Sequence, residues 1–227
     1  MANANKINGA SPVGYLNGAP WTGQARMYAV PTGDTTASYA IGDIVSSQSG
    51  SDANGIPYVI KVPAANASSF IALGIVVGVS VADAGVSLVG ANLDLTLTYI
   101  VSGTRSAVRY VYVADDPNLL FEMSTGLTAT NVTLAKAGYN SGIGSFYSGA
   151  DQTYAISQNT YLAPSSPYSN IMLASSTIST TNTLPIRMLG LAQKPDNMAI
   201  GAYTRMLCRF NNHEFSQGTG TNFTTPT

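Results

Sequence analysis

The sequence predicts an all-β fold, an antiparallel β-sandwich or barrel with long loops. Short runs rich in Val, Ile, Leu and Tyr are separated by turn residues about every 8 to 12 positions, a spacing typical of sandwiches and barrels. Residues 93–101 alternate between apolar and mostly polar side chains, as a half-buried antiparallel strand does. No segment has the apolar period of about 3.6 residues that marks an amphipathic helix.

We expect residues 1–24 to form an extended N-terminal arm. Glycines and prolines recur along this stretch and are expected to interrupt any helix or strand. The arm nevertheless carries Tyr15, Leu16 and Trp21, the only Trp of the chain. Large apolar side chains on such a segment indicate that it docks, either on its own body or on a neighbouring molecule.

A β-rich body is expected over residues 25–215. Its predicted strands, in chain order, are 26–30, 39–46, 57–62, 70–79, 93–101, 108–114, 184–192 and 203–210. The apolar run 70–81 is too short for a membrane helix, and its valines and two glycines favour a buried strand. The N-terminus has one Lys and no apolar stretch behind it, so we expect no signal peptide and synthesis in the cytoplasm.

Two regions are expected to depart from the regular body. Residues 124–184 are richer in Ser, Thr, Asn and Gly, with short aromatic islands. They are predicted to form loops and short strands, either as an elaborated loop region or as a second subdomain. Residues 216–227 are polar and predict a flexible C-terminal tail.

Charge is scarce in this chain. Lys and Arg total 10 and Asp and Glu total 11, which makes 9% of the residues charged, against roughly 25% in an ordinary soluble domain. A surface of Ser, Thr, Asn, Gly and Tyr is weakly self-repelling and suits a protein packed against copies of itself or a larger body. The alternative is a free β-domain from an organism whose proteins carry little charge.

The basic residues argue against nucleic acid as the main partner. The net charge is −1 and the Lys and Arg residues are scattered, whereas phosphate binding draws on clusters of them. Arg205 and Arg209 are four residues apart in a predicted strand and therefore share a face. That pattern is more typical of an interface or a solvated edge than of a phosphate site.

The residue inventory argues against an enzyme and against a cofactor. His213 is the only His, and no nucleophile elbow lies near it. One His and one Cys are too few for a zinc site, and Cys208, within an alternating apolar pattern, is expected to be a small core residue. The acidic turn 115–118 has two interpretations: a pair of oxygen ligands for Ca²⁺, or a tight turn between two strands, which we favour.

The segment 108–123, in which Asp115-Asp116-Pro117-Asn118 joins two strands, resembles a motif of small head proteins of tailed bacteriophages, the capsid decoration or cement proteins. Further segments are similar to that family in style and order, and together these segments cover about half of the chain: 15–18, 24–30, 42–45, 52–55, 73–78, 187–191, 194–197 and 206–215. Residues 124–184 share only composition with it.

The resemblance implies a non-enzymatic structural protein on the outside of a phage capsid, made in the bacterial host cytoplasm. It would bind as a homotrimer and clamp neighbouring subunits of the major capsid protein against the internal DNA pressure, with no cofactor, membrane or nucleic acid as partner. On residue type, the candidate partner-binding residues are Tyr15, Leu16, Trp21, Arg26, Arg109, Arg205 and Arg209.

Two other functions stay open at this point. The tyrosines of 139–170 could stack on sugars in a receptor- or glycan-binding head fibre or adhesin. A small-substrate hydrolase would have to use His213 as its only histidine base.

Overall fold

The structure, a computed structural model, confirms the all-β fold class. The residues it describes are 9–34, 37–62, 69–81, 99–100, 103–104, 108–126, 133, 136–147, 150–152, 169–197 and 200–216. Within these ranges helical structure is limited to 3-10 turns, at Lys136 and in η3 (Ser175–Thr177). The strands form a closed barrel, a five-stranded sheet and two smaller sheets.

Five strands close the barrel in the order β2-β5-β4-β6-β8. Their bounds are β2 (Arg26–Val30), β5 (Pro57–Lys61), β4 (Ile44–Ser51), β6 (Gly74–Val81) and β8 (Arg109–Ala114). Neighbouring strands are antiparallel except β2 and β5, which run parallel where Ala29 lies opposite Tyr58. Alternate side chains point into the barrel and form a hydrophobic cluster that includes Val30, Val45 and Val76.

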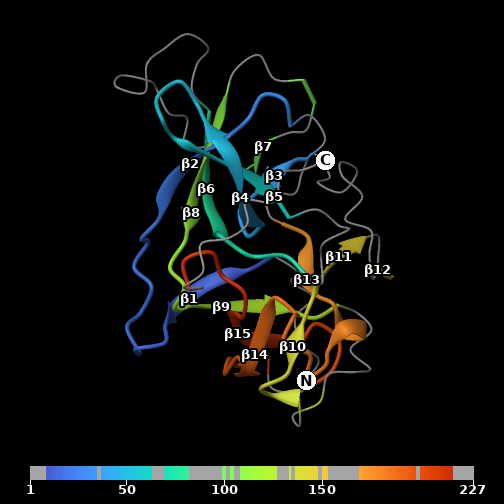
Figure 1. The fold of residues 1–227 in the computed structure, drawn as a ribbon. Helices are drawn as coiled ribbons and strands as arrows, with labels where there is room; N and C mark the ends of the chain where they lie inside the picture. The colour runs from blue at the N-terminus through green and yellow to red at the C-terminus, as the bar shows by residue number, and fades with distance from the viewer. Residues whose placement is uncertain are drawn as a thin grey trace.

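The five-stranded sheet is antiparallel and has the order β1-β9-β15-β14-β10. Its strands are β1 (Ser11–Tyr15), β9 (Leu119–Ser124), β15 (Arg205–Phe210), β14 (Ile186–Leu191) and β10 (Asn140–Ser141). In Figure 1 the barrel lies above this sheet. The larger core joins them, because sheet residues such as Phe121 and Cys208 cluster with Ile44 and Ile75 from the outside of the barrel.

The smaller sheets are β12-β11-β13 and β3-β7. They consist of β12 (Ala150–Gln152), β11 (Ile143–Tyr147), β13 (Ile171–Leu173), β3 (Tyr39–Ala40) and β7 (Tyr99–Ile100). From the region 124–184, Ile143, Ile171 and Leu173 belong to the larger core. Residues 1–8, 82–98, 153–168 and 217–227 lie outside the described residues, and with them most of the predicted strand 93–101 and of the predicted tail.

The expectation that glycine and proline exclude any strand from residues 1–24 is wrong. Residues Ser11–Tyr15 form β1, which pairs with β9 at the edge of the sheet. An edge strand tolerates Pro12, which has no N–H, because one side of the strand forms no hydrogen bonds to a neighbouring strand. The pairing with β9 shifts register between Pro12 and Gly14, as at a β-bulge. The described part of the arm therefore docks on its own body, and it links the sheet to β2 along one side of the molecule (Figure 1).

The predicted strand 39–46 is divided in two. Gly42 has φ 94°, in the left-handed region, and the Asp43 N–H donates to the Ala40 carbonyl at 3.1 Å. This turn separates β3 from β4. Apolar residues stand on both sides of it, in 39–41 and 44–45, which explains why the sequence alone predicts one strand.

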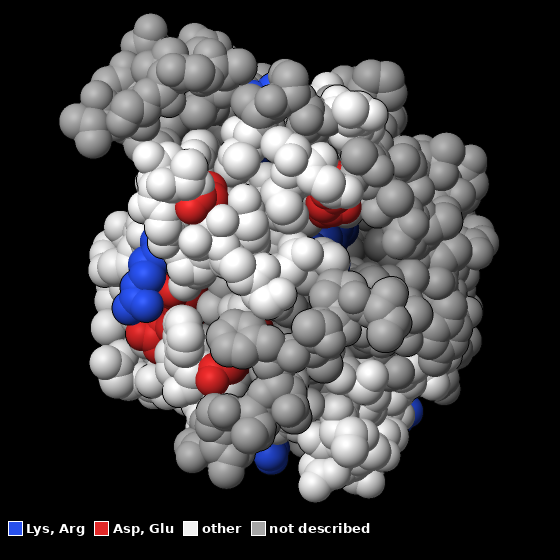
Figure 2. All heavy atoms as spheres, turned by 45° about the horizontal axis from the view of Figure 1, so that its top comes forward, with Lys and Arg blue, Asp and Glu red and all other residues white. Residues whose placement is uncertain are grey.

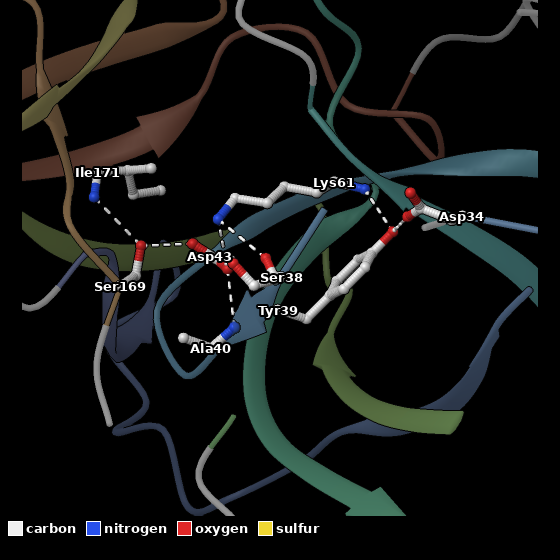
Figure 3. A network of polar contacts seen from close by, with 8 residues as sticks. All are labelled: Asp34, Ser38, Tyr39, Ala40, Asp43, Lys61, Ser169 and Ile171. Carbon is white, nitrogen blue, oxygen red and sulfur yellow. Dashed lines mark hydrogen bonds and ion pairs between the residues drawn. The ribbon is translucent and has the colours of Figure 1, made fainter. Parts of the chain in front are cut away.

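A buried polar network next to this turn ties the barrel to β13 (Figure 3). The Asp43 carboxylate forms an ion pair with Lys61 Nζ at 2.9 Å and accepts hydrogen bonds from Ala40 N at 2.8 Å and the Ser169 hydroxyl. Ser169 Oγ in turn accepts the Ile171 N–H at 3.2 Å. Asp43 thus holds together the start of β4, the end of β5 and the entry to β13.

Candidate functional site

A groove of about 1150 Å³ lies where the N-terminal segment meets the β8–β9 turn. It is lined by parts of 15–19, by 24–26, by 114–119 and by Phe215. These segments come from the sheet edge, the barrel and the chain after β15, so the groove exists only in the folded molecule. Three of the seven candidate partner-binding residues, Tyr15, Leu16 and Arg26, line it.

The β8–β9 turn forms one wall. Asp116 Oδ1 accepts the Asn118 N–H at 2.7 Å, and the Asp116 carbonyl accepts the Leu119 N–H at 3.0 Å. The turn interpretation of residues 115–118 is therefore confirmed. The turn does not make a hairpin, because β8 belongs to the barrel and β9 to the five-stranded sheet. The turn connects the barrel to the five-stranded sheet.

Asp115 fixes an arginine at the rim of the groove. Its Oδ2 accepts the Tyr28 hydroxyl at 2.7 Å and lies 3.4 Å from the Arg26 guanidinium. Burial and this hydrogen bond raise the pKa of Tyr28, which stays protonated and acts as a donor. The Arg26 side chain is 70% exposed, and its guanidinium lies 5.9 Å from the centre of the Phe215 ring, in cation–π range.

Exposed apolar side chains are concentrated at the groove. Among the described residues three large apolar side chains are exposed, and Leu16 (43%) and Phe215 (53%) both line it. The third, Val13 (37%), lies on β1 outside the groove lining. Exposed apolar groups beside a positioned Arg are the composition of an interface centre rather than of an ordinary solvated surface.

The backbone that carries Leu16 is fixed. The Leu16 N–H donates to the Asn118 carbonyl at 3.0 Å, and the Gly18 N–H donates to the Tyr15 carbonyl at 2.9 Å. The Tyr15 hydroxyl donates to Gln24 Oε1 at 3.1 Å. Partial burial is the main cause that raises the pKa of Tyr15, and the negative charges of Asp116 and Asp115 raise it further. Leu16 is therefore presented on a hydrogen-bonded loop, which lowers the entropy lost on binding.

Phe215 is held by the segment that follows β15. Its N–H donates to His213 Nδ1 at 3.1 Å, and the two rings lie 5.8 Å apart. Glu214 anchors the same segment on the barrel, because its carboxylate accepts the Ser47 N–H at 2.7 Å and its own N–H donates to Ala72 O at 2.9 Å. Burial lowers the pKa of His213 to about 4, so this imidazole is neutral at pH 7 and serves to position Phe215.

The other candidate residues lie elsewhere. Trp21 lies between the two N-terminal segments that line the groove, 15–19 and 24–26. Its ring packs against the larger core, and its Nε1–H donates to the Gln24 carbonyl at 3.2 Å. Arg109 lies opposite Val30, whereas Arg26 lies opposite Val113, which puts the two arginines at opposite ends of the β2–β8 pair. The remaining two lie on β15, where intermediate exposure alternates with burial, and share the face turned away from the core: Arg205 and Arg209.

Phe215 is not a candidate from the sequence, and Asp115 is considered there only as a Ca²⁺ ligand or a turn residue, although both line the groove. No local pattern distinguishes Phe215 from a core residue such as Phe210, because its exposure depends on how 211–216 folds onto the barrel. Tyr139, one of the tyrosines that suggested sugar stacking, packs against the larger core. Cys208 is buried, as expected of a core residue, and burial raises the pKa of its thiol.

Charged side chains are few, and some of those in the described ranges form ion pairs, as Arg26 and Lys61 do. Figure 2 shows one face, on which the Lys and Arg atoms are scattered in separate places and some of them adjoin Asp or Glu. In the described ranges no group of three or more His, Cys, Asp or Glu residues could hold a metal ion, and no helix is long and apolar enough to cross a membrane. Comparison of the chain with protein-family models, curated proteins and solved structures finds no match.

Proposed function

We propose that this chain is a non-enzymatic structural protein that binds the outside of a phage capsid and stabilises contacts between subunits of the major capsid protein. The observation that carries the proposal is the groove, where Leu16 and Phe215 are exposed on fixed backbone beside Arg26. Such a group provides the apolar centre that protein interfaces require. We propose this groove as the capsid-binding surface.

The low charge of the chain supports the same function. Long charged side chains lose rotamer entropy and hydration when an interface forms, and only 9% of the residues are charged. A protein that covers a capsid in many copies gains from this at every contact. Repeated weak contacts on one shell then add up to durable attachment.

The resemblance to capsid decoration proteins further implies trimers at local symmetry axes and a location on the virion exterior. Both stay predictions. In a trimer, each groove would engage one shell subunit while the three copies hold each other in place. Native mass spectrometry of the purified chain tests the trimer directly.

The test of the groove is binding to shells of the source phage from which this protein has been removed. Leu16→Ser and Phe215→Ser each remove an apolar contact worth about 1.5–3 kcal/mol, which corresponds to roughly tenfold to hundredfold weaker binding. Val13→Ser is the matched control, since Val13 is also exposed but does not line the groove. It should bind as the wild type does.

Thermal unfolding of all three variants confirms that each remains folded. Equal binding by the two groove variants and the control would show that the groove is not the contact surface. Failure of the wild-type chain to bind any shell would remove the capsid function itself.

A further inference from the structure

The five-stranded sheet has a second face, turned away from the core. On β9 and β15 core residues such as Phe121 and Cys208 alternate with residues that point to the other side, among them Leu120, Leu207 and Arg209. The register places Arg209 opposite both Leu120 on β9 and Arg187 on β14. A row of Leu120, Arg209 and Arg187 therefore crosses three strands.

This face carries more positive than negative charge. Two of its cations have carboxylate partners: Lys194 Nζ lies 2.6 Å from Glu122 Oε2, and an Arg205 nitrogen lies 2.5 Å from Asp196 Oδ1. Arg187 and Arg209 form no ion pair with any residue that the structure describes. The chain as a whole has a net charge of −1, so the excess of two cations here is a local feature.

Two arginines directly opposite each other on neighbouring strands are unfavourable in the isolated protein. Like charges at this position of an antiparallel pair repel, and the Arg209 Nε–H is already oriented by a hydrogen bond to Phe210 O at 3.2 Å. A carboxylate bound between the two guanidinium groups would remove the repulsion. Each guanidinium can form a two-point hydrogen bond with a carboxylate.

We propose that this face, the row Leu120–Arg209–Arg187 with Leu207 beside it, binds a carboxylate-bearing surface of a neighbouring capsid subunit. The inference rests on the proposed function and gives the partner's chemistry at a second contact. The groove lies at the junction of sheet and barrel, whereas this face lies on the far side of the sheet. Two separate contact surfaces allow one molecule to bridge two shell subunits.

A protein surface suits this face better than nucleic acid does. A single carboxylate can bind between Arg187 and Arg209 alone, whereas a phosphate backbone that crosses the face would also pass Glu122 and Asp196, which would repel it. The leucines Leu120 and Leu207 offer apolar contact that a phosphate chain does not use. Arginine mixed with apolar side chains is the composition of protein interfaces.

The test is a graded series at Arg187, which is exposed, and at Arg209, measured as binding to stripped shells of the source phage. Lys keeps the charge but not the two-point geometry, Gln removes the charge, and Glu reverses it. Affinity should fall in that order, by roughly tenfold for each Gln substitution, and the Arg187→Gln/Arg209→Gln double variant should lose most of its salt dependence. Leu16→Ser should lose affinity but keep the salt dependence.

Three results would overturn the inference. If the double variant binds shells like the wild type while Leu16→Ser binds weakly, the capsid function stands and this face is not a contact. If the wild type binds no shell, both proposals fall. If the double variant loses binding to double-stranded DNA and not to shells, the partner is nucleic acid.

Discussion

Replacing Asp43 by Ala should destabilise the fold more than any loss of a surface charge. The Asp43 carboxylate is fully buried and receives Lys61 Nζ, Ala40 N and the Ser169 hydroxyl. The Lys61 side chain is only 13% exposed, so truncation leaves a nearly buried cation without its counter-charge. Removing one partner of a buried ion pair costs about 3–5 kcal/mol, and we expect a loss near 3 kcal/mol because Lys61 keeps some contact with water.

The matched control is Asp196→Ala. Asp196 also forms an ion pair, with Arg205 at 2.5 Å, in which the Arg205 side chain is 18% exposed. The Asp196 side chain is 44% exposed, whereas that of Asp43 is fully buried, so water can take the place of the lost carboxylate only in the control. Exposed pairs contribute about 0–1 kcal/mol. Urea unfolding followed by far-UV circular dichroism measures both variants. With a urea m value of about 2–3 kcal/mol/M, Asp43→Ala should lower the midpoint by roughly 1 M or more, and the control by much less.

A double-mutant cycle separates the ion pair from the rest of the network. Adding Lys61→Met to Asp43→Ala removes the stranded cation, so the double variant should be more stable than Asp43→Ala alone. The reasoning is refuted if the two substitutions are additive, or if Asp43→Ala shifts the midpoint no further than Asp196→Ala.

Three further predictions concern the packing of the body. Gly74→Ala should lower the free energy of unfolding by about 1–3 kcal/mol, since the added Cβ would lie 2.3 Å from Ala114 O. In the control, Gly190→Ala, the added Cβ has no atom within 4 Å, so the stability should hardly change. Equal urea midpoints for the two variants would contradict this. The depressed pKa of His213 means that only the unfolded chain takes up its proton as the pH falls from about 6.5 toward 4. The wild type should therefore lose about 2 kcal/mol more stability than His213→Phe between pH 8 and pH 5, and parallel pH profiles would refute the linkage. Cys208 should react with a thiol reagent only after unfolding; rapid labelling of the native protein would show that it is accessible.

The strands that the sequence predicts best are those whose alternation survives in the fold. The predicted strand 26–30 coincides with β2, and 108–114 contains β8. In both strands alternate side chains point into the barrel and away from it, so the period-2 pattern is visible in the local sequence. Pattern alone does not say which strand pairs with which, and β8 and β9, adjacent in the chain, belong to different sheets.

β1 shows what local propensity misses. Its Pro and Gly residues argue against a strand, but pairing with β9 along an edge overrides that preference. The same pairing places Leu16 against the β8–β9 turn. The position of the groove therefore depends on a contact between residues about one hundred positions apart, which no local pattern encodes.

The groove could be predicted only in part for the same reason. Residue type alone indicates Leu16 and Arg26, since large apolar groups on a docking segment and arginine are common in interfaces. The pairing of Arg26 with Asp115 follows from the β2–β8 register, in which Arg26 lies opposite Val113. Register and the path of 211–216 are tertiary properties, and both determine which side chains share the groove.

The central claim is that this chain covers a phage capsid, and the most direct test is its copy number in purified virions of the source phage. Quantitative mass spectrometry compares it with the major capsid protein in the same particles. We expect stoichiometric amounts, with one copy for each shell subunit. Absence from the particle, or a number sufficient only for a vertex or the tail, would contradict the account.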